Sequence, residues 1–346
     1  MIGEHMAKAG NYYYDQLNKE QQKAYYAIKE GLLNLQDSFA VPMLTQKELS
    51  DIYFMIRMDC PAIFYSVTFS YRHYADSTAV EMIPQYLFTK NKIKEHCQAM
   101  ESRVKKLAHQ AANLDEKGKE LFIHDFLVKN VKYDKLKKEY SHEIIGALGN
   151  GVAVCEGIAK AVKILCDELN IWCIIALSEA NPDKGIKYRH AWNVIRINGQ
   201  YYHLDVTFDN TLSKDDTVRY DYVNLSDKQI FRDHEPVIWK VPACSDSDHF
   251  YYKEKKISWT TMDEVQNRTK QAVKKGKVLL FHWRGGYLTK EILRELMEIF
   301  DKEAQAKNKR AYVSVNWPQA VLRVRFEDGI GQEQLEMEEA NEGEKG

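Results

Sequence analysis

The sequence predicts a multi-domain α+β protein, because amphipathic helices and alternating strands occur in separate blocks along its 346 residues. Two stretches in the middle of the chain carry most of this prediction. From Cys155 to Leu169, apolar residues recur every three or four positions, which is typical of a helix with one buried face. Asn198-Gly199 then joins two alternating segments, which predicts a hairpin with a two-residue turn.

Cys155 is expected at the start of its helix, because the glycine-containing run Gly146–Gly151 before it favours a loop. Unpaired N–H groups and the positive end of the helix dipole stabilise a thiolate at such a position. The neighbouring Glu156 should have the opposite effect, since one negative charge disfavours a second. Cys155 is therefore a candidate nucleophile.

The turn fixes a register for the hairpin, in which three pairs face each other: Ile197 and Gln200, Val194 and His203, and Trp192 and Asp205. His190 is then a diagonal neighbour of Asp205 on the same face, within reach of a hydrogen bond. A carboxylate there would orient the imidazole ring and stabilise its charged form. His203 lies on the same face and is an alternative base, although packing or a hydrogen bond behind the site also explains it.

A thiol, an imidazole and a carboxylate form a nucleophile, a base and a group that orients the base. They lie within four motifs: Ile123-His-Asp-Phe-Leu-Val-Lys-Asn-Val-Lys-Tyr133-Asp134, Val154-Cys155-Glu-Gly157-Ile-Ala159-Lys-Ala161, His190-Ala-Trp192-Asn and Tyr202-His-Leu-Asp205-Val-Thr207-Phe-Asp209. With these motifs, residues 121–209 resemble the transglutaminase-like superfamily, which has a papain-like fold, in its bacterial branch. The resemblance implies that Cys155 is the catalytic nucleophile, His190 the base and Asp205 the orienting carboxylate.

The resemblance also implies a reaction, namely thiol-dependent acyl chemistry on an amide of a protein or peptide substrate. Water as the acceptor would make the protein a cysteine peptidase or amidase, and an amine would make it a transglutaminase-like acyltransferase. No cofactor and no metal is expected. The alternative is a non-catalytic module that keeps the fold and binds a protein or glycan, with the tyrosine-rich N-terminal part as its surface.

The composition of the chain indicates which partners are not expected and in which cellular compartment the protein is expected. The formal charge is −1, from 49 basic and 50 acidic residues, so no nucleic-acid partner is expected. No hydrophobic run is long enough for a membrane span, and no secretory signal pattern begins the chain. The six cysteines show no metal or redox spacing, which favours free thiols in a cytoplasmic protein. Secretion would require a signal peptide that has been removed.

Changes in pattern along the chain predict five segments: an N-terminal tail (1–10), an N-terminal α+β module (11–95), the transglutaminase-like core (96–245), a small C-terminal α+β domain (250–330) and an acidic disordered tail (331–346). Capping boxes predict three helix starts, at Asn18 with Gln21, Thr45 with Glu48, and Thr261 with Glu264. Residues 91–131 are expected to form two helices, the second of which packs beside the Cys155 helix.

For several other polar residues, a structural role is the favoured interpretation. His124 and Asp125 are adjacent on a helix, where neighbouring side chains do not face each other. Tyr133 and Asp134 follow in a loop, where they would line either a cleft or the surface. Asp209 and Asn210 are expected to end a strand as turn residues. Asp233–Pro236 and Asp246–His249 are rich in oxygen and nitrogen atoms that could ligate a metal, but neither has a recognised ligand spacing, and loops commonly collect such residues.

Overall fold

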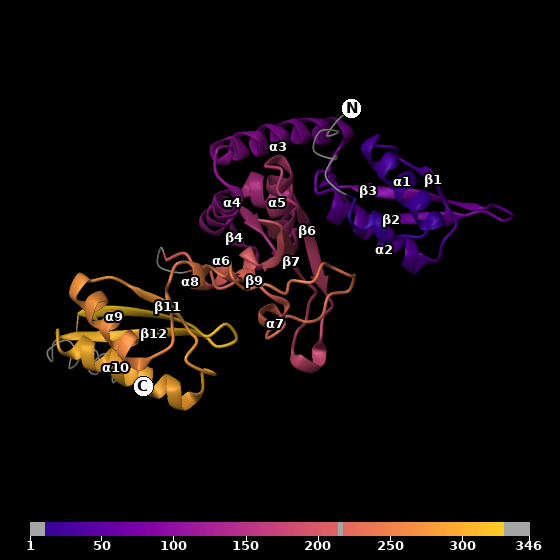
Figure 1. The fold of residues 1–346 in the computed structure, drawn as a ribbon. Helices are drawn as coiled ribbons and strands as arrows, with labels where there is room; N and C mark the ends of the chain where they lie inside the picture. Colours follow the sequence, from indigo (N-terminus) through magenta and orange to yellow (C-terminus); the bar gives the residue numbers. More distant parts are fainter. Residues whose placement is uncertain (1–10, 214–216, 329–346) are drawn as a thin grey trace, which may run out of the picture. The chain divides into compact units, whose positions relative to one another are not determined.

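The computed structural model describes residues 11–213 and 217–328, so both predicted tails lie outside the described residues. Helices make up 45% and strands 23% of the structure, which confirms the mixed α+β class. The chain divides into two compact units, Met1–Ser247 and Asp248–Gly346 (Figure 1). Within the described ranges, no helix is both long and apolar enough to cross a membrane.

The first unit begins with a small antiparallel sheet and two helices. The helices are α1 (Lys19–Leu33) and α2 (Gln46–Asp59), and the strands are β1 (Phe39–Pro42), β2 (Ser66–His73) and β3 (Ala79–Tyr86), in the order β1-β3-β2. Both helices begin at the predicted capping boxes, in which side chains satisfy N–H groups of the first turn. The short strand β1 has no counterpart in the sequence-based prediction.

The rest of this unit packs helices against a four-stranded antiparallel sheet of order β6-β7-β8-β9. The long helices are α3 (Lys90–Ala111), α4 (Glu116–Asn130) and α5 (Cys155–Glu168), and the strands are β6 (Cys173–Ser178), β7 (His190–Ile197), β8 (Gln200–Leu204) and β9 (Val223–Leu225). As expected, α4 lies beside α5, which also packs on β7 (Figure 1). The buried Asn193 side chain of β7 donates to the Ala159 carbonyl of α5 at 3.0 Å.

The glycine-containing run before Cys155 is a helical turn, so the expectation of a loop there is wrong, whereas the expected helix start at Cys155 is confirmed. Ile145–Asn150 form a π-helix, which ends at Gly151 with φ 64°. Strand β5 (Val152–Ala153) then pairs in parallel with β4 (Lys132–Tyr133), and α5 begins directly afterwards. Glycine serves close packing here as well as turning, because a Cβ at Gly146 would lie 2.5 Å from the Tyr140 carbonyl oxygen.

The β7–β8 hairpin has the predicted register, with Ile197 opposite Gln200 and Val194 opposite His203. Its turn residues Asn198 and Gly199 have φ of 50° and 82°, as a type I′ turn requires. The ladder stops one pair before Asp205, so the expected pairing of Trp192 with Asp205 is not part of it. Asp205 instead caps a helix, α6 (Val206–Leu212), because its carboxylate accepts the first free N–H groups.

Contacts far apart in the sequence join the first helices to this core. The Tyr13 hydroxyl donates to the Ile175 carbonyl of β6 at 2.5 Å. Arg57, in the last turn of α2, forms ion pairs with Glu143 and, at 3.1 Å, with Glu156 of α5. The N-terminal module therefore contributes charge to the helix that begins with Cys155.

The second unit contains a four-stranded sheet of order β10-β11-β13-β12 with two long helices. The strands are β10 (Ser258–Trp259), β11 (Leu279–Trp283), β12 (Lys309–Asn316) and β13 (Val321–Asp328), and the helices are α8 (Tyr251–Glu254), α9 (Met262–Lys275) and α10 (Lys290–Gln305). Side chains of both long helices share one apolar core with the sheet, centred on Trp259, Phe281 and Phe300. Thr261 caps α9, at the helix start that the sequence predicts.

A tight junction at the start of α5 gives a test of this packing. A Cβ on Gly157 would lie 2.3 Å from the Ser141 carbonyl oxygen, so Gly157→Ala should destabilise the protein by about 1–3 kcal/mol in chemical denaturation. The effect should outweigh the better helix propensity of alanine. Glu168→Ala, at the exposed end of the same helix, is the control and should change stability by less than about 0.5 kcal/mol. Equal unfolding midpoints for Gly157→Ala and the wild type would contradict the close contact between Gly157 and the Ser141 carbonyl.

Candidate active site

Cys155 is the first residue of α5, and it is partly exposed. Two hollows of ≈ 310 Å³ and ≈ 250 Å³ open beside it, and both are lined by Cys155, Tyr133, Tyr188 and Arg189. The first N–H groups of a helix have no partner within the helix. This end of α5 can therefore stabilise a thiolate and can donate to a negative oxygen.

His190, at the start of β7, contacts the carboxylate of Asp205. The distance from Nε2 to Oδ2 is 2.6 Å, which leaves Nδ1 as the ring nitrogen available to Cys155. Trp192 stacks on the His190 ring, with the two centroids 5.8 Å apart. Burial alone would lower the pKa of His190, but the Asp205 carboxylate and the Cys155 thiol raise it to about 10. The raised pKa favours the protonated, imidazolium form of the ring at neutral pH.

Asp205 is buried, and both of its carboxylate oxygens are occupied. Oδ1 accepts the N–H groups of Thr207 at 2.8 Å and Phe208 at 3.0 Å, while Oδ2 faces the imidazole of His190. Burial would raise the pKa of Asp205, but His190 and His234 hold it well below its usual range. The structure thus brings together the three residues that the sequence singles out, and their catalytic role stays a prediction.

The charge of Glu156, expected to oppose a thiolate at Cys155, is balanced by two cations. Lys160 lies 2.8 Å and Arg57 3.1 Å from the Glu156 carboxylate, and His142 contacts its other oxygen at 3.1 Å. Burial would raise the pKa of Glu156, but Lys160 and Arg57 hold it well below its usual range. Glu156 is therefore part of a neutralised ionic network beside Cys155.

His234 is a site residue that the sequence-based reasoning missed. Its Nε2 lies 2.9 Å from Asp205 Oδ2, the oxygen that His190 also contacts. It belongs to the irregular segment after α7 (Asp227–Ile230), where no periodicity places a side chain. His203, the alternative base, is buried behind Trp192, from which it accepts a hydrogen bond at 3.0 Å, and its Nε2 contacts Asp227 at 2.8 Å.

Among the residues that the structure describes, two groups of side chains place potential metal-ligand atoms within 4.8 Å of one another: His190 with Asp205 and His234, and His203 with Asp227 and Cys244. In both groups the imidazole nitrogens already contact the carboxylate, at 2.6, 2.9 and 2.8 Å. A metal would have to displace the protons in these contacts. The geometry therefore favours hydrogen bonding in both places.

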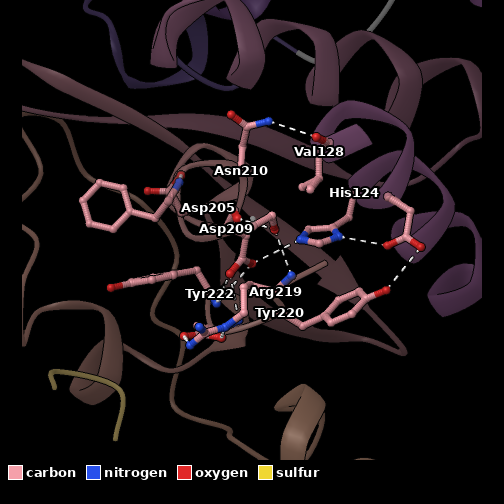
Figure 2. A network of polar contacts seen from close by, with 12 residues as sticks. His124, Val128, Asp205, Asp209, Asn210, Arg219, Tyr220 and Tyr222 are labelled. Carbon is pink, nitrogen blue, oxygen red and sulfur yellow. Dashed lines mark hydrogen bonds and ion pairs between the residues drawn. The ribbon is translucent and has the colours of Figure 1, made fainter. Parts of the chain in front are cut away.

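Another buried histidine, His124, contacts the helix that follows Asp205 (Figure 2). His124 of α4 contacts Asp209 through Nε2 and Asp125 through Nδ1, both at 3.1 Å. The ring of Tyr220 stacks on His124, and its hydroxyl donates to Asp125. The expectation that adjacent His124 and Asp125 do not meet is wrong, because the imidazole ring reaches the neighbouring carboxylate directly.

Asp209 and Asn210 lie in α6, so the expectation that they are turn residues is also wrong. Asp209 accepts the N–H of Asp221 at 2.7 Å, and Asn210 donates to the carbonyls of Val128 and Val131 (Figure 2). These contacts attach α6 to the end of α4. Because Asp205 caps α6, the same contacts hold the carboxylate that orients His190.

Residues 105–206 match the family model of the transglutaminase-like superfamily. This part of the chain is therefore a transglutaminase-like domain, which confirms the resemblance indicated by the motifs. Cys155, His190 and Asp205 all fall within the matched range. The assignment supports thiol-dependent chemistry in general.

Three solved structures resemble the chain at low identity. One, described as a TGase, is 11% identical with a TM-score of 0.30, over 49% of this chain and 50% of that chain. A proposed cysteine protease from Cytophaga hutchinsonii is 17% identical with a TM-score of 0.27, over 41% and 62% of the two chains. A proposed protease from Parabacteroides distasonis is 11% identical with a TM-score of 0.23, over 41% and 40%. The chain thus spans less than two thirds of each. No curated protein matches the sequence.

The His124 contacts predict how stability depends on pH. Burial alone would lower the pKa of His124, but its hydrogen bonds to Asp125 and Asp209 raise it to about 9. Since the pKa of the buried Asp209 beside it is raised as well, the folded pair holds more protons than the unfolded chain, so its contribution to stability is largest at low pH and is lost as the pH rises through about 9. His124→Gln should therefore cost about 3 kcal/mol at pH 6 and less above pH 9, in denaturant titrations.

His73→Gln is the matched control, because His73 is exposed on β2. Its stability curve should follow that of the wild type at every pH. If the difference between His124→Gln and the wild type stayed constant from pH 6 to above pH 9, the charged state of His124 would be refuted.

Proposed function

We propose that the protein is a thiol-dependent hydrolase of peptide amides that works through Cys155, His190 and Asp205. The observation that carries the proposal is the His190–Asp205 hydrogen bond beside a partly exposed cysteine at a helix N-terminus. The local charges support the same chemistry, because the raised pKa of His190 favours a thiolate–imidazolium pair. A transglutaminase-like acyl transfer would use the same first step and differ only in the acceptor.

In the first step, the Cys155 thiolate attacks the amide carbonyl carbon, and the carbonyl oxygen becomes negative. His190 holds the proton that came from the thiol and gives it to the nitrogen of the leaving amine. The C–N bond then breaks, which leaves a thioester at Cys155. Asp205 keeps the imidazole oriented and stabilises its positive charge throughout.

The negative oxygen needs hydrogen-bond donors, and we infer two candidates beside Cys155. The Cys155 N–H lies in the first turn of α5, where it has no intrahelical acceptor. Tyr133 of β4 lines both hollows next to Cys155. Burial, Cys155 and Asp205 raise the pKa of Tyr133 to about 12, so its hydroxyl stays protonated and able to donate.

The second step returns the enzyme to its starting state. His190, now neutral, takes a proton from a water molecule as that water attacks the thioester. The C–S bond breaks, the thiolate of Cys155 is restored beside the imidazolium, and a carboxylic acid leaves. An amine in place of water would give a new amide and so an acyl transfer.

The two hollows suit a chain that passes over Cys155, with one part of the substrate on each side of the reacting amide. The larger has an apolar part formed by Phe54, Val154, Leu177 and Ala191, beside the polar side chains of Lys137, His142, Glu156 and Arg189. A large apolar side chain next to the reacting amide would bury its surface there. The smaller hollow, which contains His190 and Glu235, would then hold the leaving-amine side.

The reaction can be tested on a library of peptides with varied side chains, read by mass spectrometry. Wild-type protein should cleave peptides that carry a large apolar residue beside the cut, and Cys155→Ala should lower the rate by about 10³-fold or more. Cys97→Ala is the matched control, because Cys97 is a buried thiol of α3 outside the site. Equal loss in both variants would point to misfolding.

A parallel assay separates the acceptors. Peptides with glutamine are incubated with a primary amine, and ammonia release and amine incorporation are measured together. Incorporation of the amine without cleavage of the peptide would contradict hydrolysis and would show that the reaction is acyl transfer. Tight peptide binding that survives Cys155→Ala, with no turnover by wild type in either assay, would contradict both and support the non-catalytic binding module.

A further inference from the structure

His234 is bonded to the same oxygen that orients the proposed base. Its Nε2 lies 2.9 Å from Asp205 Oδ2, and His190 Nε2 lies 2.6 Å from that atom. The opposite nitrogen, Nδ1, lies 2.8 Å from Asp233 Oδ1. Tyr222 donates its hydroxyl to the other oxygen of Asp233 at 2.5 Å. A continuous series of contacts therefore runs from Tyr222 to His190.

The ring of His234 is also held sterically. Its side chain is 1% exposed, and four rings pack around it, with centroids 4.5 to 5.7 Å away: Phe208, Trp192, His190 and Tyr222. Burial alone would lower the pKa of His234, but its bonds to Asp205 and Asp233 raise it. A ring between two carboxylates donates from both nitrogens, and an imidazole can do so only as a cation.

We propose that His234 is a positioning residue of the site: as a cation shared by Asp205 and Asp233, it fixes Oδ2 of Asp205 toward His190 and sets the pH range in which Cys155 and His190 form an ion pair. The inference rests on the proposed function, since it concerns the same thiol and base. In this role, His234 neither transfers a proton to the substrate nor contacts the substrate.

The sign of the effect follows from electrostatics. A positive charge lowers the pKa of each acid near it, and the centroids of the His234 and His190 rings are 5.2 Å apart. Several other titratable groups face this pair from the surrounding elements: Cys155 of α5, Tyr133 of β4, Asp205, Tyr222, Asp233, Glu235, and Lys187, Tyr188 and Arg189 before β7. His234→Gln removes none of these other groups, so the only charge lost in the variant is that of His234.

The test is the pH dependence of Cys155 alkylation by iodoacetamide in the full-length protein, followed by peptide mass spectrometry. His234→Gln keeps a polar side chain but removes the charge. The acid midpoint of alkylation should move to higher pH by about half a unit or more, since the thiolate loses a neighbouring cation. His203→Gln is the control, because His203 is a buried histidine that contacts Trp192 and Asp227, and its midpoint should stay at the wild-type value.

A second measurement needs no substitution and covers the case in which His234→Gln fails to fold. The ring nitrogen shifts of His234 in the wild-type protein, recorded by NMR at pH 7, should be those of an imidazolium. A neutral ring, or an unmoved midpoint in natively folded His234→Gln, would overturn the proposal. An ordinary thiol midpoint for Cys155 in the wild type would instead refute the proposed function, and the NMR result would still decide the charge of His234.

Discussion

The carboxylate of Asp205 is the constraint on which the rest of the site depends. It is buried, and a buried charge is stable only when hydrogen bonds and opposite charges compensate it. One oxygen caps α6 through Thr207 and Phe208, and the other contacts His190 and His234. A single group therefore ends β8, starts α6 and orients the proposed base. Loss of any of these contacts would move the others.

A second set of charged side chains lies next to Cys155, around the neighbouring Glu156. Glu156 and Glu143 share Arg57 and Lys160 within a buried network, so acids and bases are matched in number there. Removing one charged side chain from this network would leave a buried charge without its partner. The cost in folding free energy is far larger than for losing a surface ion pair. Because Arg57 comes from α2, the N-terminal module contributes to the charges around Cys155.

The sequence predicts the parts of the site that local patterns encode. The Asn198-Gly199 turn fixes the hairpin register, and periodicity indicates the helix that begins at Cys155, so the three central residues could be found. The long-range contacts of the site could not be found from the sequence. His234 is 29 residues from Asp205 in an irregular segment, and Arg57 is 99 residues from Glu156. No spacing rule joins such positions, since only the packed fold brings them together.

The central claim is that Cys155 and His190 form a thiolate–imidazolium pair. Its most direct test is the rate of iodoacetamide labelling at pH 6 for each of the six cysteines, in wild type and in His190→Ala. An ordinary thiol, with a pKa of about 8.5, is almost fully protonated at that pH and reacts slowly. The account predicts that Cys155 labels much faster than the five buried cysteines and loses at least about tenfold of its rate in His190→Ala. Labelling of Cys155 at the rate of an ordinary exposed thiol, unchanged by His190→Ala, would contradict it.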